Sequence, residues 1–160
     1  MIRRFFVVVF AFALAVSAGA IFLPIAALVD PATREAGLEA TFAGVFAMID
    51  AAMSNDAPET AVMALGSLIS AIFFATCVAP LAVAALIGEA AGVRAWTWYA
   101  GASATLAAAS PWIARAARGL ERMRHASPLE GRVALLFFLT GTVTGTLYWL
   151  VAARGNEPKS

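Results

Sequence analysis

Hydrophobic residues in this chain are gathered into four long runs that contain no charged residue and no histidine. These runs are Phe5–Val29, Thr60–Gly88, Ala95–Ala114 and Val133–Ala153. An uncharged apolar stretch of about 18 or more residues predicts a transmembrane helix, because the hydrocarbon core of a bilayer is about 30 Å thick. The runs are too long, and alternate too little, for barrel strands. We therefore predict an all-α integral membrane protein that forms one four-helix transmembrane bundle. Its helices are expected near residues 5–29, 62–87, 95–114 and 133–153.

The first run has two interpretations. Arg3 and Arg4 followed by an apolar core, with Ala18-Gly19-Ala20 after it, resemble a cleaved secretory signal. The apolar run continues to Val29, however, and is about twice as long as a secretory core. We therefore favour an uncleaved first helix, which Pro24 would kink or end.

The longest polar segment, residues 30–59, predicts a short amphipathic helix in the first loop. Its apolar side chains recur at helical spacing, at Leu38, Phe42, Val45, Phe46, Ile49 and Met53. Asp30 followed by Pro31 is a signal for the start of a helix. The longest uncharged stretch here, residues 40–49, is too short to span a membrane, so we expect a helix at the membrane surface. Packing against the chain's own bundle is favoured over binding a partner.

Aromatic residues at both ends of the third run support a true crossing, although its centre is only weakly hydrophobic. Trp98 and Trp112 are separated by about 21 Å of helix and would lie at the two membrane interfaces. With four crossings, Lys and Arg number five on the side of the termini and six on the other, so the positive-inside rule does not decide the orientation. The first helix usually dominates, and Arg3 and Arg4 beside it favour cytoplasmic termini.

Alanine occupies 39 positions and arginine outnumbers lysine ten to one. This composition is typical of GC-rich bacterial genomes, so we expect a bacterial inner membrane. A net charge of +1 argues against a nucleic-acid partner, which would require a broad basic surface.

Small residues spaced four apart mark candidate contacts between helices. They are Gly141 with Gly145, Thr140 with Thr144, and Gly66 with Ser70. Such spacing lets two helix backbones approach closely in a membrane. Packing within the chain's own bundle is the first interpretation of the glycine pair in the fourth run. A homo-oligomer interface and a path for a solute, lined by the hydroxyls of residues 140–146, are the alternatives.

Residues able to carry chemistry are scarce. Ionisable side chains inside a membrane mark proton and ion pathways, and the four runs contain none. His125 is the only histidine, which argues against a histidine-based metal site. Cys77 is the only cysteine and most simply packs as a small apolar residue. We therefore expect neither enzymatic activity nor a cofactor.

An arginine cluster between the third and fourth runs is the remaining candidate binding site. Arg115, Arg118, Arg122 and Arg124 are arranged so that they could bind anionic lipid headgroups. The leading hypothesis is nonetheless a structural or accessory subunit that acts through helix–helix contacts, either with further copies or with other membrane proteins. The alternatives are a passive path for a small neutral solute and headgroup binding by the loop at 115–132.

Overall fold

The computed structural model describes residues 2–35, 58–117 and 128–154, together with isolated positions between 36 and 50. The described elements are all helical, in agreement with the predicted class. They are α1 (Ile2–Val29), α3 (Pro58–Phe73), α4 (Ala79–Ala90), α5 (Trp96–Ala117) and α6 (Pro128–Tyr148), with two π-helical turns, η1 (Phe74–Val78) and η2 (Trp149–Ala153). The predicted amphipathic helix at 30–59 falls largely outside the described residues.

Three described helical stretches are long and apolar enough to cross a membrane. They are Ile2–Val29, Ile69–Ala90 and Leu129–Ala152. These stretches correspond to the first, second and fourth predicted helices, and they indicate an integral, multi-pass membrane protein in contact with the lipid bilayer. The third predicted helix is present as α5, whose composition does not qualify it as a fourth such stretch.

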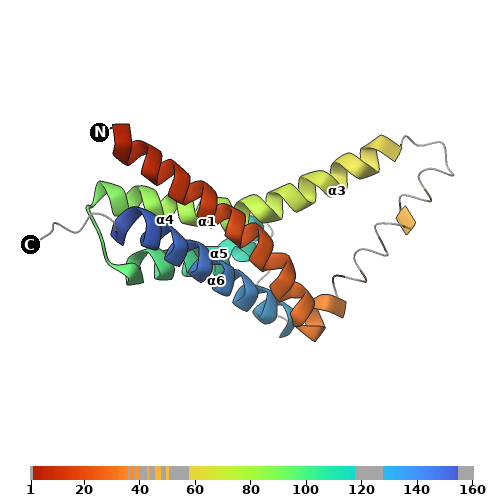
Figure 1. Ribbon diagram of the computed structural model, residues 1–160. Helices are drawn as coiled ribbons and strands as arrows, with labels where there is room; N and C mark the ends of the chain where they lie inside the picture. Colours follow the sequence, from red (N-terminus) through yellow and green to blue (C-terminus); the bar gives the residue numbers. More distant parts are fainter. Residues whose placement is uncertain are drawn as a thin grey trace, which may run out of the picture.

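The helices form a bundle from which one element departs (Figure 1). α5 and α6 are antiparallel neighbours, α1 lies across α6, and α4 packs on α5. α3, η1 and α4 follow one another without a break, but only η1 and α4 lie within the bundle, while α3 extends away from it. The start of α1, the turn between α4 and α5 and the end of η2 lie at one end, here called the N-terminal end. Asp30 and Arg132 lie at the opposite end.

Small residues form much of the buried interior, and large apolar residues lie outside. α1 buries Ala11, Ala15 and Gly19, whereas its exposed residues include Phe6 and Phe10 at 64% and 63%. Burying the largest apolar side chains would stabilise a protein in water. Between helices in lipid, small side chains allow backbones to pack closely, and the lipid solvates the large ones. The distribution is therefore that of a membrane bundle.

α1 ends at Val29, and Asp30 and Pro31 begin the next helical turn, as their sequence predicts. The Asp30 carboxylate accepts hydrogen bonds from the backbone N–H of Thr33 at 3.0 Å and from its hydroxyl at 2.7 Å. This is an N-cap, which supplies partners to the free N–H groups of a new helical turn. The following residues, 31–35, are helical. Pro31 occupies the first helical position, where a missing N–H costs nothing.

Candidate functional site

Gly141 and Gly145 lie against the backbone of α5. A Cβ on Gly141 would lie 2.7 Å from the Cα of Ala104 and would also collide with the carbonyl oxygen of Ser103. A Cβ on Gly145 would lie 2.9 Å from the Cα of Ala100. The glycine pair of the fourth run therefore forms the contact between α5 and α6 within this chain.

The threonines of α6 mostly bond to their own helix. The Thr140 hydroxyl donates to the carbonyl of Leu136 at 2.8 Å, and that of Thr144 donates to the carbonyl of Gly141 at 3.0 Å. Both threonine side chains are buried. Their donor capacity is thus used within α6, so these two hydroxyls have no hydrogen left to donate to a passing solute.

A buried polar layer crosses the middle of the bundle where η1 interrupts the α-helical ladder. Thr76 and Cys77 of η1 and Ser103 of α5 are all fully buried. The hydroxyl oxygens of Thr76 and Ser103 have no hydrogen-bond partner among the described residues. Gly19 of α1 packs on this layer, because a Cβ there would lie 3.2 Å from the Cys77 Sγ. π-Helical turns often occur at functional sites, but the thiol of Cys77 is not grouped with two further Asp, Glu, His or Cys side chains in the part of the chain that the structure describes.

Ionisable side chains gather instead at the N-terminal end of the bundle. Arg4 of α1 donates to the Glu89 carboxylate of α4 at 2.6 Å, and this carboxylate also lies 3.4 Å from the hydroxyl of Tyr148 in α6. The Tyr148 ring packs on Tyr99 of α5, with 5.3 Å between ring centroids. Glu89 therefore links α1, α4 and α6.

The turn between α4 and α5 is closed by backbone hydrogen bonds. Gly92 adopts a left-handed conformation with φ of 65°, and its N–H donates to the carbonyl of Glu89 while that of Val93 donates to Gly88. This pattern is a Schellman motif, in which glycine is favoured because a Cβ would strain the left-handed backbone. The Tyr99 hydroxyl then donates to the carbonyl of Val93 at 2.9 Å. The hairpin is consequently tight.

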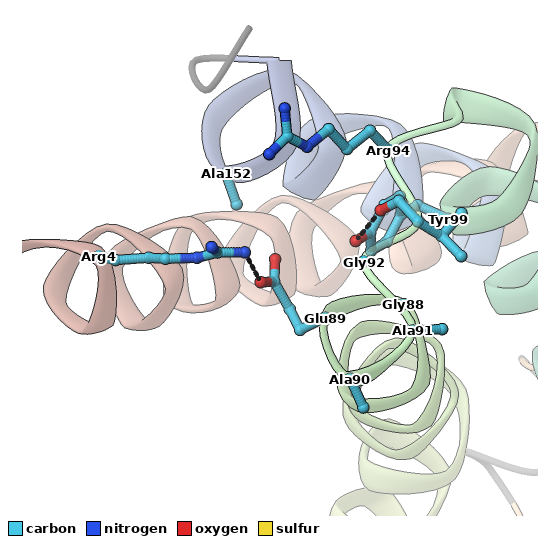
Figure 2. A pocket seen from close by; sticks show the side chains of 10 residues that line it. Arg4, Gly88, Glu89, Ala90, Ala91, Gly92, Arg94, Tyr99 and Ala152 are labelled. Atoms are coloured by element: carbon cyan, nitrogen blue, oxygen red, sulfur yellow. Dashed lines mark hydrogen bonds and ion pairs between the residues drawn. The ribbon is translucent and has the colours of Figure 1, made fainter. Parts of the chain in front are cut away.

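Figure 2 shows the cavity that these residues surround. It measures about 340 Å³ and is lined by Arg4, Glu89, Arg94 and Tyr99 with the backbone of the turn. Arg4 reaches across from α1 towards Glu89. The side chains of Arg4 and Glu89 are 57% and 24% exposed, so the ion pair is open to solvent or headgroups and is not sealed in the bundle. This arrangement favours a link between helices over a site for proton transfer.

A second ion pair joins the helices at the opposite end. Arg132 of α6 donates to Asp30 at 2.9 Å. Hydrogen bonds from Thr33, followed by the nearby Arg132 guanidinium, hold the pKa of the Asp30 carboxyl below its ordinary value. Sequence reasoning missed this pair and the Arg4–Glu89 pair, because their partners are 102 and 85 residues apart. No local signal identifies such partners.

The other predicted site residues are not brought together. Gly66 and Ser70 lie exposed on α3, and a Cβ on Gly66 would meet nothing within 4 Å. Arg115 belongs to α5, but its side chain is not described, and Arg118, Arg122 and Arg124 lie outside the described residues. Within the described part of the chain, no three Asp, Glu, His or Cys side chains are grouped as metal ligands would be.

No protein-family model matches the chain, and neither a characterised protein nor a solved structure is similar to it.

Proposed function

We propose that this protein is a structural or accessory subunit of a membrane assembly, and that it acts through helix–helix contacts and not through chemistry. The observation that carries this proposal is the position of α3. Among the described elements, this 16-residue helix packs substantially only against η1, its own continuation. Figure 1 shows it extending from the bundle without a neighbour along its length among the described helices.

The exposed surface of α3 has the composition of a membrane-helix contact. Met63 is 70% exposed and Ile69 is 59% exposed. Between them in sequence, Gly66 has no side chain and leaves room for another helix backbone to approach. Ser70 lies one helical turn further along the same face and is also small and exposed. Gly141 and Gly145 show the same spacing and are covered by α5. We infer that a membrane helix from outside this chain covers the Gly66–Ser70 face in the same manner.

The proposal includes a fourth crossing by α5. This helix of 22 residues has a length of about 33 Å. It packs antiparallel along α6, and the indole N–H of Trp96 near its start donates to Thr146 near the end of α6 at 3.0 Å. Pro111 and Trp112 near its other end line a cavity with Leu129 near the start of α6. If α6 crosses the bilayer, a helix alongside it over this length crosses as well.

The low hydrophobicity of α5 is consistent with this arrangement. It packs against α4, α6 and η1, and it buries Tyr99, Ser103, Ala104 and Ala107. A helix covered by other helices exposes less surface to lipid and needs fewer large apolar side chains. We further propose that both termini are cytoplasmic in a bacterial inner membrane, as the arginines beside α1 favour.

Cysteine crosslinking in native membranes tests the role of α3. The buried Cys77 can remain, and a Ser70→Cys variant places a second thiol on the proposed contact face. We expect oxidation to give an adduct whose mass shows whether the partner is a second copy or another membrane protein. The matched control is Leu86→Cys on α4, which is 72% exposed but lies on the bundle. Adding Gly66→Leu to Ser70→Cys should abolish the adduct.

Two outcomes would reject the proposal. One is a Ser70→Cys protein that forms no more adduct than Leu86→Cys. The other is an adduct that persists when Gly66 is replaced by leucine, because the contact would then not depend on a close approach of backbones.

A further inference from the structure

An apolar groove runs between α1 and α6 at the end of the bundle that carries Asp30 and Arg132. Its volume is about 600 Å³. The walls are apolar side chains of the two helices, Phe22, Ile25, Ala26, Val29, Leu135, Leu136 and Leu139. Asp30 and Arg132 line it as well, and their ion pair lies at one end of the groove, here called its mouth. The groove is thus apolar along its length and charged at its mouth.

The groove exists because the close contact between α1 and its neighbours stops at Gly19. The buried residues of α1 are Ala11, Ala15 and Gly19, and no residue of α1 beyond Gly19 is buried. Phe22 is the first groove residue along α1, and Ile25 and Val29 follow it on the same wall. Beyond these residues, the ion pair of Asp30 with Arg132 joins the end of α1 to the start of α6.

The dimensions of the groove match part of one bilayer leaflet. From Leu139 to Arg132 the helix rises by about 10 Å, and from Phe22 to Asp30 by about 12 Å. One leaflet contributes about 15 Å of hydrocarbon. With α1 and α6 in a bilayer, the ion pair lies at the depth of lipid headgroups and the groove lies at the depth of the upper acyl chain.

The two charges at the mouth distinguish between headgroups. The Arg132 side chain is 55% exposed, and one nitrogen of its guanidinium contacts Asp30. A guanidinium has five N–H donors, and their planar arrangement suits the oxygens of a phosphate. The Asp30 carboxylate accepts bonds from Thr33 and Arg132 but is still 25% exposed, so it can accept another donor. The primary ammonium of an ethanolamine headgroup can donate a hydrogen bond to the Asp30 carboxylate, whereas the quaternary ammonium of choline has no N–H to donate. An anionic headgroup is repelled by the charge of this carboxylate.

We propose that this groove binds one phospholipid with a phosphoethanolamine headgroup. An acyl chain lies along the apolar walls, the phosphate contacts Arg132, and the ammonium donates to Asp30. The inference depends on α1 and α6 lying in a bilayer but not on the contact made by α3. Failure of the Gly66–Ser70 experiment therefore leaves it unaffected.

Native mass spectrometry of the full-length protein tests this site. The protein is released from vesicles that contain equal amounts of phosphatidylethanolamine, phosphatidylcholine and phosphatidylglycerol with identical acyl chains. We expect phosphatidylethanolamine to be retained over phosphatidylcholine by about two- to fivefold, as for one partly exposed ion pair. Phosphatidylglycerol should be retained less than phosphatidylethanolamine.

Variants at the mouth separate the two contacts. Asp30→Asn removes the charge but keeps the helix cap, since asparagine caps as well as aspartate, and it should abolish the preference for ethanolamine over choline. Arg132→Gln should lower retention of all three lipids. Leu135→Trp, which fills the groove, should do the same and supplies a readout independent of charge. Glu59→Gln on α3 is the matched control and should change nothing.

The proposal is overturned by equal retention of phosphatidylethanolamine and phosphatidylcholine, or by a preference for phosphatidylglycerol. It is also overturned if Asp30→Asn, with its melting temperature showing a folded protein, keeps the preference of the wild type.

Discussion

A single methyl group added at Gly145 should force α5 and α6 apart. The new Cβ of Gly145→Ala would collide with the carbonyl oxygen of Tyr99, and it would lie 2.7 Å from the carbonyl carbon of Tyr99 and 2.9 Å from the Cα of Ala100, whereas ordinary contact begins near 3.4 Å. All three are backbone atoms of a helix, so none can rotate away. The two helices must therefore move apart along the contact between α5 and α6, which also includes Gly141.

The expected cost follows from two opposing effects. Overpacking of a tight interior destabilises by about 1 to 3 kcal/mol, while replacing glycine by alanine inside a helix stabilises by about 1 kcal/mol. The net change at Gly145 is therefore a loss of up to about 2 kcal/mol in the free energy of unfolding. Gly101→Ala is the matched control, because Gly101 is also helical and a Cβ there meets nothing within 4 Å. It should be neutral or stabilising.

Reversible unfolding in mixed micelles, followed by circular dichroism, measures both variants against the wild type. The order of stability should be Gly101→Ala at or above the wild type, and Gly145→Ala below it. Equal stability of the two variants would show that Gly145 does not lie as close to the backbone of α5 as the structure has it, and it would refute the predicted clash.

Two further predictions concern single side chains. Because the pKa of Asp30 is below its ordinary value of 3.8, mainly through Thr33, the ionised carboxylate stabilises the folded state above that pH. This stabilisation should be lost as the pH falls through the lower folded-state pKa. The melting temperature of wild type should then approach that of Asp30→Asn on acidification; a difference independent of pH would contradict the assignment. Cys77 is fully buried, so a maleimide should label it only after the protein is unfolded in detergent, and rapid labelling of the folded protein would argue against the buried layer around η1.

Local patterns predicted much of the fold. The three qualifying spans follow from uninterrupted hydrophobicity, which depends on neighbouring residues alone. The cap at Asp30 likewise involves groups only three residues apart. The sequence predicts α5 as a helix, but its packing against α4, α6 and η1 is seen only in the structure. α4 and α6 directly precede and follow α5 in the chain, but which of their faces contact α5 depends on how the three helices pack.

The small-residue pairs show the same limit in the candidate sites. Gly141 with Gly145 and Gly66 with Ser70 have the same spacing, yet the first pair contacts α5 and the second faces no described element. The spacing predicts a surface that another backbone can approach, but it carries no information about which backbone does so.

The amino-acid sequence by itself determined the helical class, three of the helices able to span a membrane and the N-cap at Asp30 that follows the first of them, because hydrophobic run length and capping depend on nearby residues. Only the tertiary structure decided that Arg4 pairs with Glu89 and Asp30 with Arg132, and that a groove opens between α1 and α6. These features depend on how far apart two packed helices lie and on which ends meet, and such distances are set by the side chains of both helices together.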